Sequence, residues 1–182
     1  FADIRKVEAS SEDIYDIAIV GVNGQCVSER YGYFQLERDF MSYNFARATL
    51  TAPQQTIVHE NPVVIHQNPA ETDLITVTTG VFRTGTNDLI GTIHVDILKD
   101  SLRHILDDVQ WSPTSLVTIV NKQGHPVLHN STGGFSDQSL REILTPDGTS
   151  SSTTMEIGQS DYLVVTDHLS LVPWQLVVGV PL

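Results

Sequence analysis

Short alternating runs of apolar and polar residues, separated by turn-forming residues, make up most of the chain. Alternation with a period of two is typical of strands, whereas apolar residues spaced three and four apart indicate a helix. Strands are predicted at residues 13–22, 25–29, 73–83, 88–98, 115–121, 125–130, 153–157, 162–168 and 174–180. Helices are predicted at residues 1–10, 35–50, 100–109 and 136–144. Residues 31–34 are expected to form an aromatic loop, and residues 51–71 a loop with a short strand at 63–66, because this stretch holds three prolines and shows no clear period.

The pattern occurs twice along the chain. Residues 19–27 read IVGVNGQCV and residues 119–127 read IVNKQGHPV, so that the turn glycines Gly24 and Gly124 lie 100 residues apart. Such internal similarity predicts an α+β fold of two tandem antiparallel sheets, each with helices on one face. The expected divisions are the end of an N-terminal helix at 1–10, a first unit at 11–98, a connecting helix at 99–112 and a second unit at 113–182.

Composition excludes several classes of protein. Ten Lys and Arg against 22 Asp and Glu give a net charge of −12, which argues against nucleic-acid binding and against docking on an anionic membrane surface. The single cysteine, Cys26, rules out an internal disulfide and sites built from several cysteines. No apolar run reaches the roughly 18 residues of a membrane-spanning helix. The chain begins at Phe1 and ends directly after a strand-like run, so we expect it to be a piece of a longer protein.

Three stretches, in this order and spacing, resemble the double Cache sensor domain of bacterial histidine kinases and chemoreceptors. They are LIGTIHVDI at residues 89–97 with the helix that follows, VTIVNKQG at 117–124, and VPWQLVVGVP at 172–181. The resemblance implies two PAS-like units outside the membrane, the first distal and the second proximal to it. The pattern is most like sensor histidine kinases of Gram-positive bacteria. Relatives that bind amino acids carry an Arg-x-Trp-Tyr motif, but residues 38–43 here read RDFMSY, so the resemblance does not indicate an amino-acid ligand.

The resemblance and the residues together suggest a ligand site in the first unit. Asp96 stands where amino-acid-binding relatives carry the carboxylate that takes the ligand's amine; the alternative is that it bonds backbone near the following helix. Aromatic walls and one guanidinium would suit a small carboxylate, whereas helical aromatic spacing also indicates simple core packing. Strand 73–83 adds alternating polar residues, although which face they share is open without the register. The candidate ligand-binding residues are Tyr31, Tyr33, Tyr43, Arg47, Thr78, Arg83 and Asp96.

Metal and catalytic chemistry find little support in the sequence. His125 and His129 lie on one predicted strand about 13 Å apart at ~3.3 Å per residue, which is too far for one metal ion. His59 and His66 are seven apart in a predicted loop and form no ligand set locally. No Gly-x-Ser-x-Gly motif, phosphate loop or Gly-x-Gly-x-x-Gly motif is present. We therefore expect no catalytic residues, no metal and no cofactor in this chain.

These observations lead to one functional hypothesis. The chain is interpreted as the extracytoplasmic sensor region of a membrane-bound receptor, with a histidine kinase as its output. A small solute would bind the distal unit between its sheet and residues 31–50, and the change would pass to a transmembrane helix outside this chain. The expected parent is a homodimer anchored by flanking transmembrane helices, and the fragment itself a monomer. The alternatives are a chemoreceptor, a cyclic-dinucleotide enzyme, an interaction module that binds no solute, and a secreted hydrolase.

Overall fold

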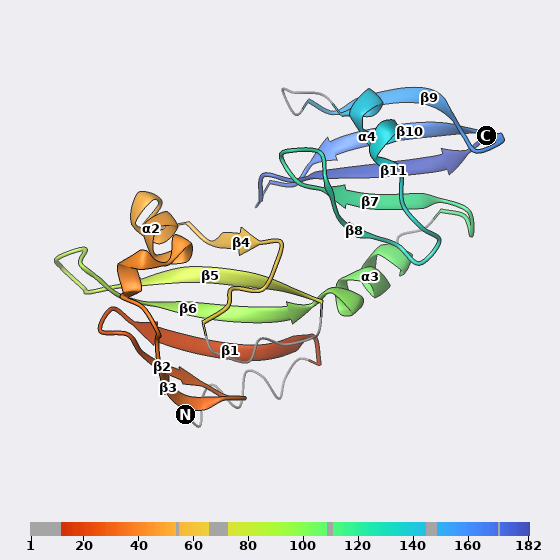
Figure 1. Cartoon of the computed structure of the whole chain (residues 1–182). Helices are drawn as coiled ribbons and strands as arrows, with labels where there is room; N and C mark the ends of the chain where they lie inside the picture. The colour runs from red at the N-terminus through yellow and green to blue at the C-terminus, as the bar shows by residue number, and fades with distance from the viewer. Residues whose placement is uncertain (1–11, 54, 66–72, 109–110, 145–148, 171) are drawn as a thin grey trace. The chain divides into compact units, whose positions relative to one another are not determined.

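The computed structural model describes residues 12–53, 55–65, 73–108, 111–144, 149–170 and 172–182. These residues fall into two compact units, Phe1–Lys99 and Asp100–Leu182, each built on one antiparallel sheet (Figure 1). The predicted N-terminal helix at 1–10 lies outside the described residues. None of the helices described is long and apolar enough to cross a membrane.

Unit one is a six-stranded sheet with its helices on one face. Its strands are β1 (Ile14–Gly21), β2 (Gln25–Ser28), β3 (Gly32–Gln35), β4 (Ile57–His59), β5 (Leu74–Phe82) and β6 (Leu89–Leu98). They lie in the order β3-β2-β1-β6-β5-β4. A 3₁₀ turn, η1 (Phe40–Ser42), and helix α2 (Asn44–Thr51) come between β3 and β4 and cover the sheet (Figure 1).

Unit two repeats this arrangement with five strands. They are β7 (Leu116–Val120), β8 (Pro126–His129), β9 (Ser151–Ile157), β10 (Ser160–His168) and β11 (Gln175–Pro181), in the order β8-β7-β11-β10-β9. This is the strand order of unit one without its edge strand β3. Helix α4 (Asp137–Ile143) comes between β8 and β9, as α2 comes between β3 and β4, and Ser136 caps it by accepting a hydrogen bond from the Ser139 amide. The predicted α+β fold of two tandem sheets is confirmed.

The core of each unit lies under its helix. In unit one, Ala18 and Val20 of β1 pack against Phe40, Phe45 and Ala46. In unit two, the corresponding face packs against α4 through Leu140 and Ile143, together with Phe135. Helix α3 (Lys99–Asp108) follows β6 directly and covers the opposite face of the unit-two sheet, where Leu106 contacts Val117 and Leu128. The sequence had indicated only a connector at this position.

Three predicted elements differ from the structure. The expected aromatic loop at 31–34 contains strand β3, because Gly32 at a φ of 69° lets the chain reverse and pair Phe34 with Cys26. The expected helix at 35–50 is divided into η1 and α2 by Tyr43, whose backbone is extended. The short strand expected at 63–66 is absent from its described part, 63–65, and β4 lies earlier, at 57–59. Apolar spacing at 36–46 therefore reports burial on one face rather than a continuous helix.

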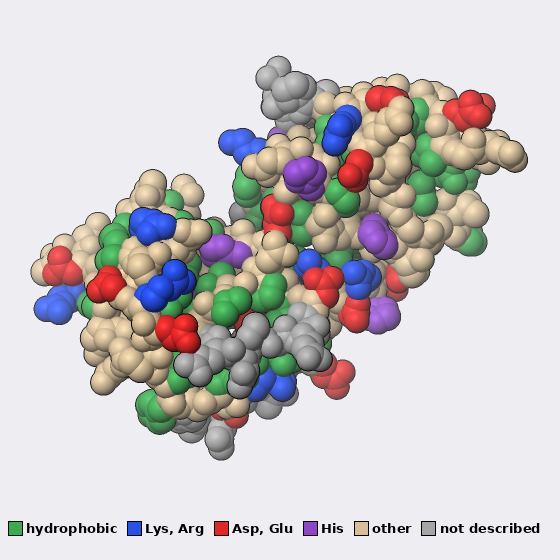
Figure 2. Space-filling view, viewed as in Figure 1, with side chains coloured by type: hydrophobic (Ala, Val, Ile, Leu, Met, Phe, Trp, Pro, Cys, Tyr) green, Lys and Arg blue, Asp and Glu red, His purple; other side chains and the backbone are tan. Residues whose placement is uncertain are grey.

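The surface carries charges of both signs. On the face shown in Figure 2, acidic and basic side chains are interspersed in each unit, although the sequence carries a net charge of −12. Within the described part of the chain, no three or more His, Cys, Asp or Glu side chains come close enough together to hold a metal ion.

Candidate functional site

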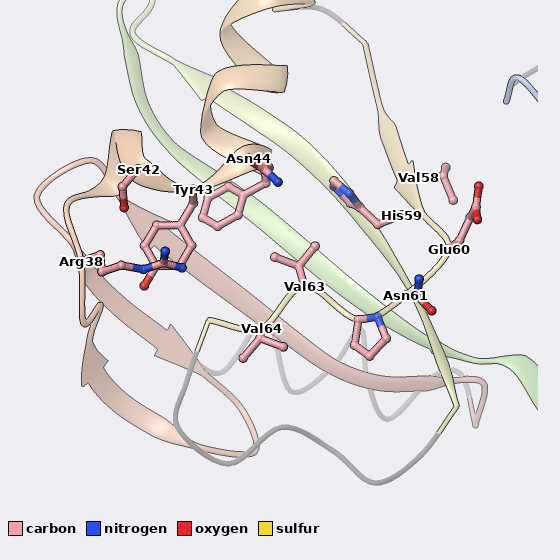
Figure 3. Close-up of a pocket in the computed structure, with 12 residues that line it drawn as sticks. Arg38, Ser42, Tyr43, Asn44, Val58, His59, Glu60, Asn61, Val63 and Val64 are labelled. Atoms are coloured by element: carbon pink, nitrogen blue, oxygen red, sulfur yellow. The ribbon is translucent and has the colours of Figure 1, made fainter. Parts of the chain in front are cut away.

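An open cavity of about 550 Å³ lies on the helix-bearing face of unit one (Figure 3). One wall is formed by residues 42–45, at the junction of η1 and α2, together with Arg38. The other wall is formed by residues 58–64, which comprise the end of β4 and the segment that follows it. The cavity is within the range of about 300–1,000 Å³ that is typical of sites for small molecules.

An arginine stacked on a tyrosine marks one end of this cavity. The Arg38 guanidinium carbon lies 4.7 Å from the centroid of the Tyr43 ring (Figure 3). Tyr43 in turn packs against Phe45, with ring centroids 5.3 Å apart. Stacking on an aromatic face positions a guanidinium while leaving its planar edge of donors available, and that edge matches a carboxylate. This end of the cavity therefore combines an apolar wall with a site for an anionic group.

Local hydrogen bonds explain why the chain presents Tyr43 here. The Asp39 carboxylate accepts a hydrogen bond of 2.8 Å from the Met41 amide and begins η1. The Arg47 guanidinium reaches back from α2 and donates hydrogen bonds of 3.2 Å to the carbonyls of Met41 and Ser42. These bonds hold η1 against α2, so Arg47 supports the cavity wall and is not among the residues that line the cavity.

Polar side chains line the sheet beneath the second wall. On β5 and β6 the register pairs Thr78 with His94 and Thr76 with Asp96. Thr78 Oγ1 lies 3.1 Å from His59 Nε2 and 3.0 Å from His94 Nδ1. Two residues further along the same face, the Thr76 hydroxyl donates to the Asp96 carboxylate and accepts a hydrogen bond of 2.9 Å from the Val63 amide. The segment that forms the second wall is thus hydrogen-bonded to the sheet at His59 and at Val63.

Burial shifts the pKa values of these groups. Burial raises the pKa of Asp96 to about 6; the Thr76 hydrogen bond opposes this shift and the charge of Asp16 adds to it. Burial lowers the pKa of His94 to about 3, with a smaller contribution from His59, and it also lowers the pKa of His59. Both histidines are therefore neutral at pH 7 and offer one lone pair and one N–H each.

Three of the seven residues expected from the sequence lie in this neighbourhood. Tyr43 lines the cavity. Thr78 is fully buried directly beneath His59. Asp96 lies behind Thr76 and does not line the cavity itself.

The other four expected residues lie apart from the cavity. Tyr33 pairs with Val27 on the face of the sheet opposite Cys26 and the core, where it is 80% exposed beside a second groove of about 560 Å³. Tyr31 is half-buried next to Ser28, whose hydroxyl accepts a hydrogen bond from the Tyr31 amide. Arg83 is exposed just beyond β5, and Arg47 acts on backbone carbonyls as described above.

Sequence reasoning missed two residues of the cavity. Arg38 was noted only as part of a motif that departs from the amino-acid-binding pattern. His59 was considered only as a metal ligand with His66, which lies outside the described residues. A neutral histidine linked to a second one 35 residues away leaves no local signal in a sequence. Its contact with Thr78 follows from the pairing of β4 with β5, which puts His59 opposite Thr76, two residues from Thr78 on the same strand.

No protein-family model matches the sequence, and no curated protein matches it significantly. Solved structures do match. The extracellular domain of the histidine kinase rpHK1S-Z16 superposes with a TM-score of 0.70 and 11% identity, over 100% of this chain and 76% of the other. The ligand-binding domain of the amino acid chemoreceptor PctC of Pseudomonas aeruginosa PAO1, in complex with GABA, superposes with a TM-score of 0.66 and 16% identity, over 94% of this chain and 76% of the other. The ligand-binding domain of the chemoreceptor CtaA of Pseudomonas fluorescens, in complex with L-isoleucine, superposes with a TM-score of 0.68 and 13% identity, over 97% of this chain and 71% of the other.

The chain has the fold of these extracellular ligand-binding domains. The prediction of a double Cache-type sensor fold is confirmed. Both histidine kinases and chemoreceptors are among the matches, so the fold does not distinguish the two kinds of receptor.

Proposed function

We propose that unit one is the membrane-distal, solute-binding unit of an extracytoplasmic sensor and that the cavity between residues 42–45 and 58–64 is its binding site. The observation that carries this proposal is the cavity itself, which is open, of small-molecule size and walled by an arginine stacked on an aromatic pair. The solute-bound chemoreceptor domains of the same fold support it.

We further propose that the solute carries a carboxylate. Arg38 supplies the cation for it, and Tyr43, Phe45 and Val63 supply apolar surface for the remainder. GABA and L-isoleucine, the ligands of two matching chemoreceptors, are both small carboxylates. A guanidinium paired with a carboxylate in a partly enclosed site gains both charge attraction and two parallel hydrogen bonds.

The signal would leave the site along β6. This strand carries Thr92, His94 and Asp96 beneath the cavity and continues directly into α3 at Lys99. Lys99 is buried and forms an ion pair of 2.7 Å with Asp73, which fixes the end of β6 to the start of β5. A solute that binds one arrangement of this wall more tightly than another shifts the population toward it, by no more than the difference in affinity.

The rest of the proposal concerns the whole receptor. The parent is a membrane-anchored, dimeric protein with a histidine kinase as output, and this chain performs no chemistry itself. Unit two is the membrane-proximal unit and passes the change to a transmembrane helix beyond the chain.

A thermal-shift screen of the 182-residue chain tests the binding proposal. The library holds small carboxylates, amino acids, sugars, amines and divalent metal ions. A solute at 100 times its dissociation constant should stabilise the protein by about 2.7 kcal/mol. Titration calorimetry on each hit then compares the wild type with Arg38→Ala and with Arg83→Ala, a matched loss of one exposed arginine from the same unit.

The proposal expects carboxylate hits that Arg83→Ala retains and Arg38→Ala loses. Hits that survive Arg38→Ala with unchanged affinity would place the site elsewhere. If no compound shifts the melting temperature, the solute-sensing proposal fails in favour of an interaction module that binds no solute.

A further inference from the structure

Four hydrogen-bonded side chains, here called the His59–Thr78–His94–Thr92 chain, connect the cavity wall with the core of unit one. His59 lines the cavity and contacts Thr78 Oγ1 through Nε2 at 3.1 Å. Thr78 Oγ1 contacts His94 Nδ1 at 3.0 Å, and His94 Nε2 contacts Thr92 Oγ1 at 2.8 Å. Thr78, His94 and Thr92 are buried, and Phe45 lies edge-on to the His94 ring at 4.6 Å. Only the His59 end of the chain reaches the cavity.

This series of hydrogen bonds has two directions in which the Thr78 hydroxyl donates as well as accepts. The hydroxyl carries one donor hydrogen, and among its contacts with the described residues only the two imidazole nitrogens can accept that hydrogen. In the inward direction His59 Nε2–H donates to Thr78, Thr78 donates to His94 Nδ1, and His94 Nε2–H donates to Thr92. In the outward direction every donor and acceptor is exchanged. Thr92 then donates to His94, His94 Nδ1–H donates to Thr78, and Thr78 donates to His59 Nε2.

The direction decides what His59 offers to the cavity. Its second ring nitrogen, Nδ1, has no hydrogen-bond partner among the described residues, and its ring points from the end of β4 toward α2 (Figure 3). In the inward direction Nδ1 is a lone pair that accepts a hydrogen bond. In the outward direction Nδ1 carries the hydrogen and donates one. A ligand group that contacts Nδ1 therefore selects the direction of the whole chain.

The charge of this end of the cavity limits which ligand group fits. Glu60 also lines the cavity, but its side chain and that of Val58 lie on the other side of β4 from His59 (Figure 3), since successive side chains of a strand face opposite sides. Asp96 already accepts a hydrogen bond from Thr76 and does not line the cavity. A ligand ammonium placed against His59 would therefore lose water without gaining a carboxylate on its own side of β4, which is costly in a partly enclosed site.

We propose that His59 is the specificity-determining residue of unit one and that it recognises an uncharged hydroxyl or carbonyl group of the solute through the His59–Thr78–His94–Thr92 chain. This inference rests on the proposed solute-binding function. It adds that the carboxylate ligand carries a neutral polar group in place of the ammonium group of an amino acid, and that its contact with His59 is transmitted to His94 inside the sheet.

The first test needs no ligand. In the inward direction both histidines carry the hydrogen on Nε2, and in the outward direction both carry it on Nδ1, so the two rings must share one tautomer. Long-range ¹H–¹⁵N spectra of the histidine-labelled chain at pH 7.5 report the tautomer of each ring. His129 calibrates the measurement, because its Nδ1 lies 2.9 Å from the Asn130 carbonyl and must carry the hydrogen. Matching tautomers of His59 and His94 are expected, and opposite tautomers would overturn the proposal.

The second test uses matched solutes. The pairs are 4-hydroxybutyrate with 4-aminobutyrate, and 2-hydroxy-3-methylpentanoate with L-isoleucine, measured by calorimetry on the wild type and on His59→Phe. The hydroxy acid of a pair should bind about tenfold more tightly to the wild type, and His59→Phe should remove that preference. Tighter binding of the amino acid would overturn the proposal.

The two tests separate the two claims. If none of the four solutes binds and the tautomers match, the proposed binding of small carboxylates is at fault while the hydrogen-bond chain stands. If solutes bind with Arg38-dependent affinity and the tautomers are opposite, solute binding stands and the role given to His59 is refuted.

Discussion

Replacing Thr78 by valine removes one hydroxyl and leaves the shape of the side chain almost unchanged. That hydroxyl serves His59 Nε2 and His94 Nδ1 together, and Thr78 itself is fully buried. His59 is only partly buried and can turn toward water, whereas His94 is 3% exposed and cannot. The loss is therefore that of one buried ring nitrogen without a partner, which costs about 1–3 kcal/mol.

The measurement is urea unfolding followed by far-UV circular dichroism. With a slope of about 1–3 kcal/mol per molar urea, a loss of this size moves the midpoint by roughly 1 M. Thr79→Val is the matched control, since Thr79 lies next to Thr78 on β5 with its side chain exposed. Its midpoint should stay within the ±0.5 kcal/mol that is usual for surface substitutions.

A double mutant tests whether the unpaired nitrogen of His94 is the cause of the destabilisation. In Thr78→Val with His94→Phe, both partners of the lost hydrogen bond are replaced by apolar groups. The combined destabilisation should be smaller than the sum of the two single effects, because the second substitution removes the unpaired nitrogen that the first one creates. If Thr78→Val unfolds with the midpoint of Thr79→Val, the hydroxyl supports neither histidine and the reasoning is refuted.

Three further predictions use the same unfolding assay. As pH falls from 6.5 toward 4, the wild type should lose up to about 1 kcal/mol per pH unit relative to His94→Phe, because the unfolded chain protonates His94 and the folded chain, with its pKa of about 3, does not. Asp96, with its pKa raised to about 6, contributes the opposite slope in both proteins, so parallel curves would contradict the burial of His94. Gly179→Ala places a Cβ 2.8 Å from the Phe135 ring and should cost about 1–3 kcal/mol, an effect that Phe135→Leu must reduce if the clash is its cause. Ser136→Ala removes the α4 cap and should cost about 1 kcal/mol, and an unchanged midpoint would deny the cap any role.

The hairpins of both units could be predicted because their signals are local. Asn23-Gly24 closes β1 onto β2, and Gly24 has the positive φ of 79° that such turns require. The strands β5 and β6 were equally evident from alternation. Strand β4 was not, because three residues at the sheet edge give too short a pattern to distinguish from a loop.

The site could be predicted only in part, since it depends on register rather than on residue type. Near the turn Phe82 pairs with Leu89, so an unbroken register would pair Thr78 with Ile93. An irregularity between Val81 and Phe82 shifts the pairing by one residue and brings Thr78 opposite His94. A register shift of one residue exchanges the two faces of a strand, and the sequence pattern does not indicate the shift between Val81 and Phe82.

The internal repeat shows that the His59–Thr78–His94–Thr92 chain has no complete counterpart in unit two. Aligning Gly24 with Gly124 makes Val20 equivalent to Val120, which pair with Thr92 and Gln175 respectively. Counting along β6 and β11, His94 then corresponds to Val177, and Asp96 corresponds to Gly179.

These two exchanges remove an imidazole and a carboxylate from the helix-bearing face of the unit-two sheet, which keeps Thr118 and Thr166 as buried polar side chains. Val177 is fully buried in the core of unit two, and the Phe135 ring packs over Gly179 where a side chain would otherwise stand. At the positions where unit one offers an imidazole and a carboxylate, unit two offers only hydrocarbon, so no ligand group can be recognised there by hydrogen bonding. If unit one binds a solute as proposed, the two copies of one fold differ at the positions beneath the binding site, and in unit two these positions belong to the packed core.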